Sequence, residues 1–123
     1  MSANAVQFFL IMRNQIKLYH WQTGMYSRHK GTDDVVKSLD DNIDKFVEVY
    51  MGKYGRPKMS SRNNVITLKN LSEKNAIVFV KACIQELLEE VPRGLKKTDT
   101  DLLNIRDEML GDLNQLLYLF TLD

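Results

Sequence analysis

Apolar residues recur at steps of three and four along four separate stretches of this chain, and this spacing most constrains its fold. Such a repeat places apolar side chains on one face of an α-helix. No stretch alternates with period two over a useful length, so no β-sheet is expected. The pattern predicts an all-α fold with helices over about Ala3 to Gln22, Arg28 to Lys53, Ser72 to Val91 and Asp99 to Phe120.

Residues that end or begin helices separate these four stretches. Gly55 is expected to end the second helix and Pro92 the third, because glycine adopts the helix-ending conformation and proline cannot continue a helix. Ser72 is the candidate N-cap of the third helix. Thr98 or Asp99 is expected to cap the fourth in the same way.

One longer connection, from Lys58 to Leu71, joins the second and third predicted helices. A long crossover at this point is the connectivity of ferritin-like bundles and differs from a simple up-and-down arrangement. The chain has 123 residues, 44% of them hydrophobic, which is enough for one core. We therefore expect a single four-helix-bundle domain of the ferritin-like type over residues 1–123.

Charge and cysteine content narrow the partners and the compartment. The formal net charge is +1, so bulk attraction to DNA, RNA or an anionic membrane is not expected. Cys83 is the only cysteine; it lies on the apolar seam of the third helix and is expected to be buried and inert. A lone thiol, with no apparent signal peptide or transmembrane segment, favours the cytosol of a bacterium or host cell, or a virion interior.

Five residues have the spacing of a metal site. His29 and Asp33, and likewise Asp44 and Glu48, are four residues apart on the second predicted helix, so each pair lies on one face. Eleven residues, close to three helical turns, separate the two aspartates, so all four side chains fall on one stripe. His20, at the edge of the first helix's apolar face, is the fifth candidate.

The direction of this stripe predicts a site between two chains. The stripe lies about 90° from the apolar face of its own helix, so it points sideways. Asp33 and Asp44 are about 16 Å apart along the axis, too far for one ion to contact both. Two antiparallel copies of the helix would bring the two ends together and form two metal sites in a homodimer. Imidazole and carboxylate ligands suit iron, manganese and zinc alike. The alternative interpretation is an ordinary acidic helix face in contact with water.

Two segments resemble the Dps proteins, or mini-ferritins. They are the run YHWQTGMYSRH at residues 19–29 and the run DDNIDKFVEVYMGKYGRP at residues 40–57, with Asp33 between them. The family pattern is a His-Trp pair, a second histidine, an aspartate four residues later, a D-x-x-x-E and a Gly-Pro stop. The matching residues here are His20, Trp21, His29, Asp33, Asp44 and Glu48.

The resemblance implies a ferroxidase centre shared between subunits. One chain would contribute His20, His29 and Asp33, and its two-fold partner would contribute Asp44 and Glu48. Fe(II) would be oxidised there by peroxide or oxygen, in a homodimer or larger homo-oligomer. Among ferritin-like proteins, the chain also resembles small ones of large DNA viruses.

Two other functions stay open, the first because the gap between the histidines and the crossover are both shorter than in typical Dps proteins, and the second because histidine and carboxylate bind zinc as well as iron. One is a non-catalytic structural or assembly protein, such as a minor virion component, that retains the bundle. The other is a dimer stabilised by zinc without redox activity.

Overall fold

The computed structural model describes residues 3–122 and contains four α-helices and a short 3₁₀ segment. The helices are α1 (Ala3–Gln22), α2 (Tyr26–Tyr54), α3 (Glu73–Glu89) and α4 (Thr100–Leu119), with η1 (Val91–Gly94) between α3 and α4. Strands are absent from the described residues, so the predicted all-α four-helix bundle is confirmed. The single-domain prediction for residues 1–123 extends over Met1, Ser2 and Asp123, which lie outside the described residues.

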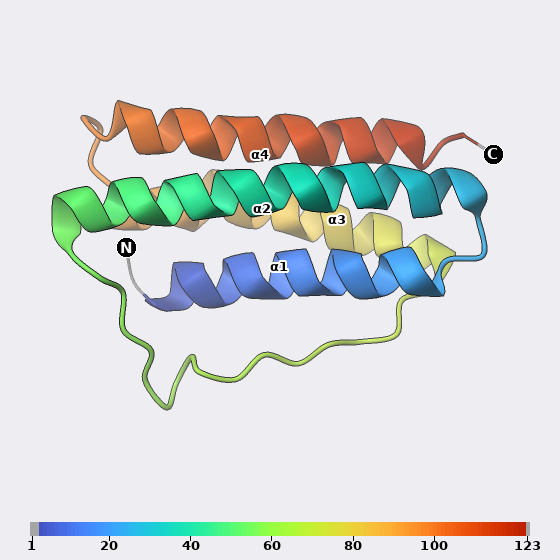
Figure 1. Cartoon of the computed structure of the whole chain (residues 1–123), viewed down its shortest axis with the longest axis horizontal. Coiled ribbons are helices and arrows are strands. Elements are labelled where there is room, and N and C mark those ends of the chain that lie inside the picture. The colour runs from blue at the N-terminus through green and yellow to red at the C-terminus, as the bar shows by residue number, and fades with distance from the viewer. Residues whose placement is uncertain (1–2, 123) are drawn as a thin grey trace.

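The long connection joins α2 to α3, as predicted, and runs the length of the bundle (Figure 1). α1 and α2 are antiparallel neighbours, the connection returns along α1, and α3 then runs parallel to α2. α4 lies against α2 and α3. None of the described helices has both the length and the apolar character that crossing a bilayer requires.

Glutamine side chains of α1 hold the crossover against the bundle. Gln15 is 2% exposed, and its amide both donates to the Lys69 carbonyl at 2.7 Å and accepts from the Lys69 amide at 2.8 Å. One turn from the start of the helix, Gln7 donates to the Val65 carbonyl at 2.7 Å. These bonds satisfy backbone groups that have no sheet or helix partner, which fixes a segment without regular structure.

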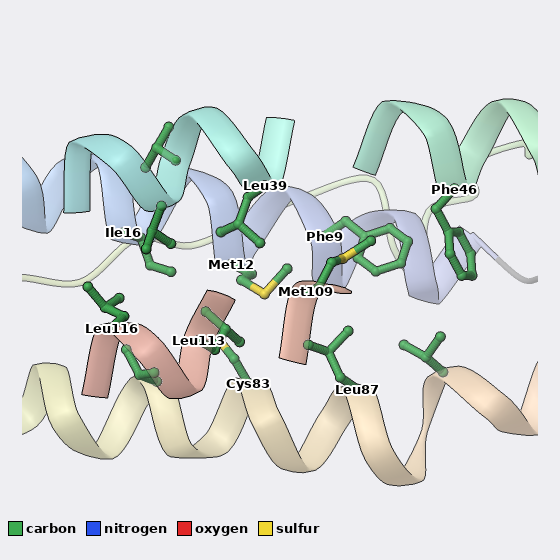
Figure 2. Close-up of a cluster of buried hydrophobic side chains, with 14 of the residues drawn as sticks. Phe9, Met12, Ile16, Leu39, Phe46, Cys83, Leu87, Met109, Leu113 and Leu116 are labelled. Carbon is green, nitrogen blue, oxygen red and sulfur yellow. The ribbon is translucent and has the colours of Figure 1, made fainter. Parts of the chain in front are cut away.

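The core lies between the four helices and is built from the apolar stripes that the sequence displays (Figure 2). Phe9 and Phe46 meet edge to face with ring centroids 5.2 Å apart. Met12, Leu39 and Leu113 are fully buried near the middle. Full burial of each such side chain contributes about 1.5–3 kcal/mol, so this packing fixes how the helices face one another.

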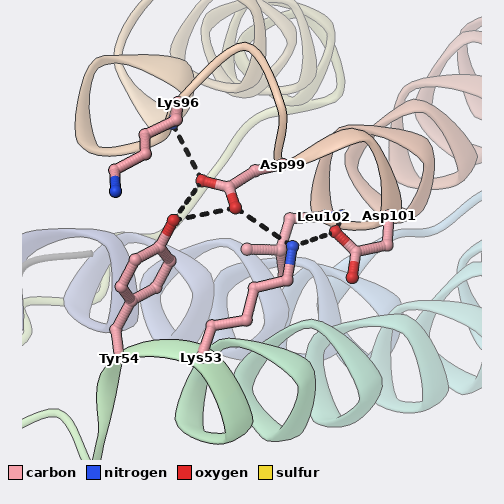
Figure 3. A network of polar contacts seen from close by, with 6 residues as sticks. All are labelled: Lys53, Tyr54, Lys96, Asp99, Asp101 and Leu102. Atoms are coloured by element: carbon pink, nitrogen blue, oxygen red, sulfur yellow. Dashed lines mark hydrogen bonds and ion pairs between the residues drawn. The ribbon is translucent and has the colours of Figure 1, made fainter.

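The predicted N-cap of α3 is confirmed, whereas the predicted N-cap of α4 has the expected position but not the expected hydrogen bond. The Ser72 hydroxyl accepts a hydrogen bond from the Asn75 amide at 3.0 Å, as expected for a cap. Asp99 occupies the N-cap position of α4, but its carboxylate makes no capping bond. It accepts instead from the Tyr54 hydroxyl, the Lys53 ammonium and the Lys96 amide (Figure 3). Asp99 therefore ties the end of α2 to the loop before α4.

Gly55 ends α2 as predicted. Its φ of 93° lies in the left-handed region, which glycine adopts without a steric penalty. Its amide still donates to the Met51 carbonyl at 3.1 Å, so the last turn stays closed. The chain then leaves the helix at a sharp angle into the crossover.

Candidate metal site on the outer flank of α1 and α2

His20 and His29 form a reciprocal clamp across the turn between α1 and α2. The Nδ1 atom of His20 lies 2.5 Å from the His29 carbonyl oxygen, and Nδ1 of His29 lies 2.8 Å from the His20 carbonyl oxygen. The two rings are stacked, with centroids 4.0 Å apart and an interplanar angle of 14°. Because a carbonyl can only accept, we assign the proton of each neutral ring to Nδ1.

This arrangement leaves the Nε2 atom of each ring with its lone pair. Neither Nε2 has a hydrogen-bond partner among residues 3–122. His20 is 6% exposed, whereas His29 is exposed. Metal-binding histidines commonly donate their other ring N–H to a backbone carbonyl, which fixes both tautomer and ring orientation. The two rings are therefore suited to bind a cation through Nε2.

Thr32 supports this clamp from one turn further along α2. Its buried hydroxyl donates to the Arg28 carbonyl at 2.6 Å, and its oxygen lies 3.0 Å from His20 Nδ1. The His20 ring is thus held by a second acceptor besides the carbonyl of His29. Thr32 has no place in the metal motif, and nothing in the linear pattern distinguishes it from a core residue.

Asp33 lies beside the histidine clamp and is partly exposed. Its carboxylate forms an ion pair with Lys37 at 3.3 Å. The hydrogen bond from Lys37 is the main cause that lowers the pKa of Asp33, and the positive charges of Lys37 and Lys17 lower it further. Asp33 is therefore an ionised carboxylate, one helical turn beyond His29 on α2. Lys37, which is largely exposed, is the cation that a metal ion would have to replace.

Asp44 and Glu48 lie exposed on the same flank, nearer the end of α2. Asp44 borders a shallow hollow of about 480 Å³ between α1 and α2, together with Arg13 and Asp40. Arg13 and Asp40 are joined by a two-bond ion pair at 2.8 and 3.2 Å. The hollow places Asp44 on the side of α2 that borders α1.

A single chain does not assemble the five candidate ligands. Across residues 3–122, no three side chains of His, Cys, Asp or Glu converge closely enough to hold a metal ion. His20, His29 and Asp33 gather at one end of the flank. Asp44 and Glu48 lie at least eleven residues further along α2, which corresponds to about 16 Å or more.

A buried arginine anchors the end of the bundle that carries the clamp. Arg28 is 6% exposed and donates to the Tyr19 hydroxyl at 3.0 Å, the Glu73 carbonyl at 2.6 Å and the Phe120 carbonyl at 3.2 Å. Its guanidinium carbon also lies 4.5 Å from the centre of the Phe120 ring. These contacts join α1, α2, α3 and the end of α4, so the clamp lies on a rigid part of the fold.

Comparison with known proteins places the chain in a family without an assigned activity. Residues 20–120 match the model of a family described as a family of unknown function, DUF5856. An uncharacterized 14.6 kDa protein from the mobD–ri intergenic region of Enterobacteria phage T4 is 29% identical over 104 residues. That alignment covers 85% of this chain and 75% of the phage protein. No solved structure matches the chain.

The family match extends from His20 to Phe120 and so includes all five candidate ligands. Neither matched name mentions a ferritin, a Dps protein or a metal, whereas the phage relative agrees with a viral connection. Since the matched segment covers most of the sequence, this chain belongs to the DUF5856 family.

Proposed function

We propose that this protein binds Fe(II) at two equivalent sites between two antiparallel copies of α2 and oxidises it there. The observation that carries the proposal is the histidine clamp. Both Nδ1 atoms are committed to backbone carbonyls, which leaves the two Nε2 atoms without a hydrogen-bond partner among residues 3–122, and the ionised carboxylate of Asp33 lies one turn further along α2. Two imidazoles and a carboxylate are ligands typical of iron sites with open coordination positions.

The numbering of the stripe supports a two-fold arrangement. When two helices are related by a two-fold axis perpendicular to them, residues whose numbers have a constant sum lie at the same height. His29 and Glu48 sum to 77, and so do Asp33 and Asp44. An axis near residue 38 would therefore bring both carboxylates of one chain to the histidine end of its partner.

The same symmetry supplies a charge contact at the centre of the dimer. Lys37 and Asp40 also sum to 77, so Lys37 of one chain would lie level with Asp40 of the other. Within each chain these two side chains pair with Asp33 and Arg13, so a contact between chains would require them to exchange partners. At the two ends, Asp33 of one chain would face Asp44 and Glu48 of the other. Each pair of carboxylates brought within about 4 Å repels by roughly 1 kcal/mol even in water-like surroundings. A bound divalent cation would offset this repulsion, so dimerisation and metal binding are expected to be coupled.

The chemistry would use iron as the substrate. His20, His29 and Asp33 of one chain and Asp44 and Glu48 of the other would hold two Fe(II) ions near each other. Each Fe(II) gives up one electron to hydrogen peroxide, whose O–O bond breaks, and two protons are taken up to form two water molecules. The carboxylates would stabilise the higher charge of Fe(III), which favours the oxidised state.

The test is Fe(II) oxidation by peroxide in the wild type and in the double variant Asp44→Ala with Glu48→Ala. Glu89→Ala with Glu108→Ala is the matched control, since it removes two exposed carboxylates from other helices. We expect the control to oxidise iron at the wild-type rate and the stripe variant to fall to the rate of free iron. Equal rates in all three proteins would refute the ferroxidase function.

The second candidate is a non-catalytic assembly protein. It is supported by the Lys37–Asp33 ion pair, which already occupies one of the candidate ligands. It predicts a dimer whose stability does not respond to metal. Elemental analysis of protein purified without chelator separates the functions, because the ferroxidase predicts iron, the zinc-stabilised dimer predicts zinc, and the assembly protein predicts neither.

A further inference from the structure

A second hollow lies on a different face of the bundle, between α1 and α3. Its volume is about 700 Å³, and it is open to solvent along one side. The walls come from the first half of α1 and the second half of α3, and η1 borders one end. This volume is in the range of small-molecule binding pockets. The pocket shares none of its residues with the candidate metal site.

The inner walls are apolar and partly aromatic. Phe8 and Ile11 line the pocket from α1, and Phe79 and Ala82 line it from α3. Both phenylalanines are half-buried, so part of each ring still faces solvent. Cys83 lies deeper in the wall and is 3% exposed. These surfaces would gain from contact with an apolar ligand, at roughly 25 cal/mol for each Å² removed from water.

The charge in this pocket comes from one carboxylate. Glu86 lines the pocket, and its side chain has no ion pair or hydrogen bond within residues 3–122. Glu90 and Arg93, also in the lining, pair with each other at 3.5 Å and largely cancel. Burial, with a contribution from the charge of Glu86, raises the pKa of Cys83 to about 12, so this thiol is neutral.

We propose that the pocket between α1 and α3 binds an organic ammonium ion carried on a short apolar chain. The apolar chain would lie against Ile11, Ala82 and Phe79. The cation would lie near the Glu86 carboxylate, with the Phe8 ring in the same pocket wall. Aromatic faces and a carboxylate together recognise organic cations, because the ring quadrupole and the negative charge attract the same group. A carboxylic acid of the same length would be repelled by Glu86.

The test compares three probes of equal length, hexylammonium, hexanol and hexanoate, titrated into the full-length protein. Binding is followed by ¹H–¹⁵N NMR shifts of the amides lining the pocket. We expect hexylammonium to bind about tenfold more tightly than hexanoate, with hexanol in between. Absence of hexylammonium binding, or equal affinity for hexanoate, would overturn the proposal.

Two variants locate the binding. Glu86→Gln should remove the preference for the ammonium, whereas the control Glu89→Gln, an exposed glutamate outside the pocket, should keep it. Ala82→Trp, at an exposed position in the wall, should weaken binding of all three probes by filling the space. Circular dichroism verifies that each variant is folded. Unchanged probe affinities in Glu86→Gln and Ala82→Trp would show that the probes bind elsewhere and would overturn the assignment.

Discussion

His29→Ala removes one half of the histidine clamp and should destabilise the fold by about 1–2 kcal/mol. The lost hydrogen bond from Nδ1 to the His20 carbonyl contributes about 1 kcal/mol net, and the lost ring stacking about the same. Alanine recovers about half a kcal/mol through its higher helix propensity. With a urea m-value of about 1.5 kcal/mol/M, the unfolding midpoint should fall by about 1 M.

Urea unfolding followed by circular dichroism measures this change, with Lys30→Ala as the control on the neighbouring exposed position. The control should shift the midpoint little, because its side chain makes no hydrogen bond or ion pair in the described chain. NMR of the ring nitrogens of the wild type at pH 8 should find both histidines protonated on Nδ1. A midpoint shift equal to that of Lys30→Ala, or protonation on Nε2, would refute the clamp.

Three further predictions follow from single contacts. The hydrogen bond from the Tyr54 hydroxyl is the main cause that lowers the pKa of Asp99 from 3.8 to about 2. The ionised Asp99 carboxylate therefore stabilises the fold fully above about pH 4, and this stabilisation is lost as the pH falls toward 2. The stability difference between wild type and Asp99→Asn, from urea titrations, should shrink over that interval; a constant difference would contradict this. Gly111→Ala should stabilise the folded protein by about 1 kcal/mol, because the new Cβ on α4 would meet no other atom within 4 Å. Gly31→Ala should stabilise it less, because the new Cβ would lie 3.2 Å from a methyl group of Leu119 on α4. Equal gains in thermal unfolding would argue against that close approach. Cys83 should resist iodoacetamide at pH 8 until the protein is unfolded, as mass spectrometry would detect; rapid alkylation of the folded protein would contradict its burial.

The helices and the crossover could be predicted because their signals are local. The apolar repeat places Leu39 and Phe46 on one face of α2, and both are fully buried. The Ser72 cap could be predicted because the hydroxyl and the amide that it accepts from, that of Asn75, are only three residues apart in the sequence. Where the contact involves distant residues, the local rule failed. Asp99 has the right residue type for a cap, but Tyr54 and Lys53 compete for its carboxylate from 45 residues away or more.

The candidate site could be predicted only in part, because some of its contacts join residues that are distant in the sequence. The spacing of His29, Asp33, Asp44 and Glu48 follows from one helix, so their common flank could be derived. The reciprocal bonds between His20 and His29 depend on how the turn folds, and no periodicity encodes them. Gln15 is another example: it lies among apolar neighbours on α1, yet its buried amide holds the crossover at Lys69.

The central claim is that each metal site takes residues from two chains, and a mixing experiment tests it directly. One variant, His20→Ala with His29→Ala, keeps only the carboxylate end, and the other, Asp44→Ala with Glu48→Ala, keeps only the histidine end. Each alone should bind no metal. After the two are mixed, unfolded and refolded together, at least half of the dimers should be mixed, because random pairing gives half and bound metal stabilises only the mixed dimer. Each mixed dimer should contain one complete site, so metal binding should recover to between about a quarter and a half of the wild-type occupancy. A mixture that binds no more metal than the two separate variants would contradict the shared site.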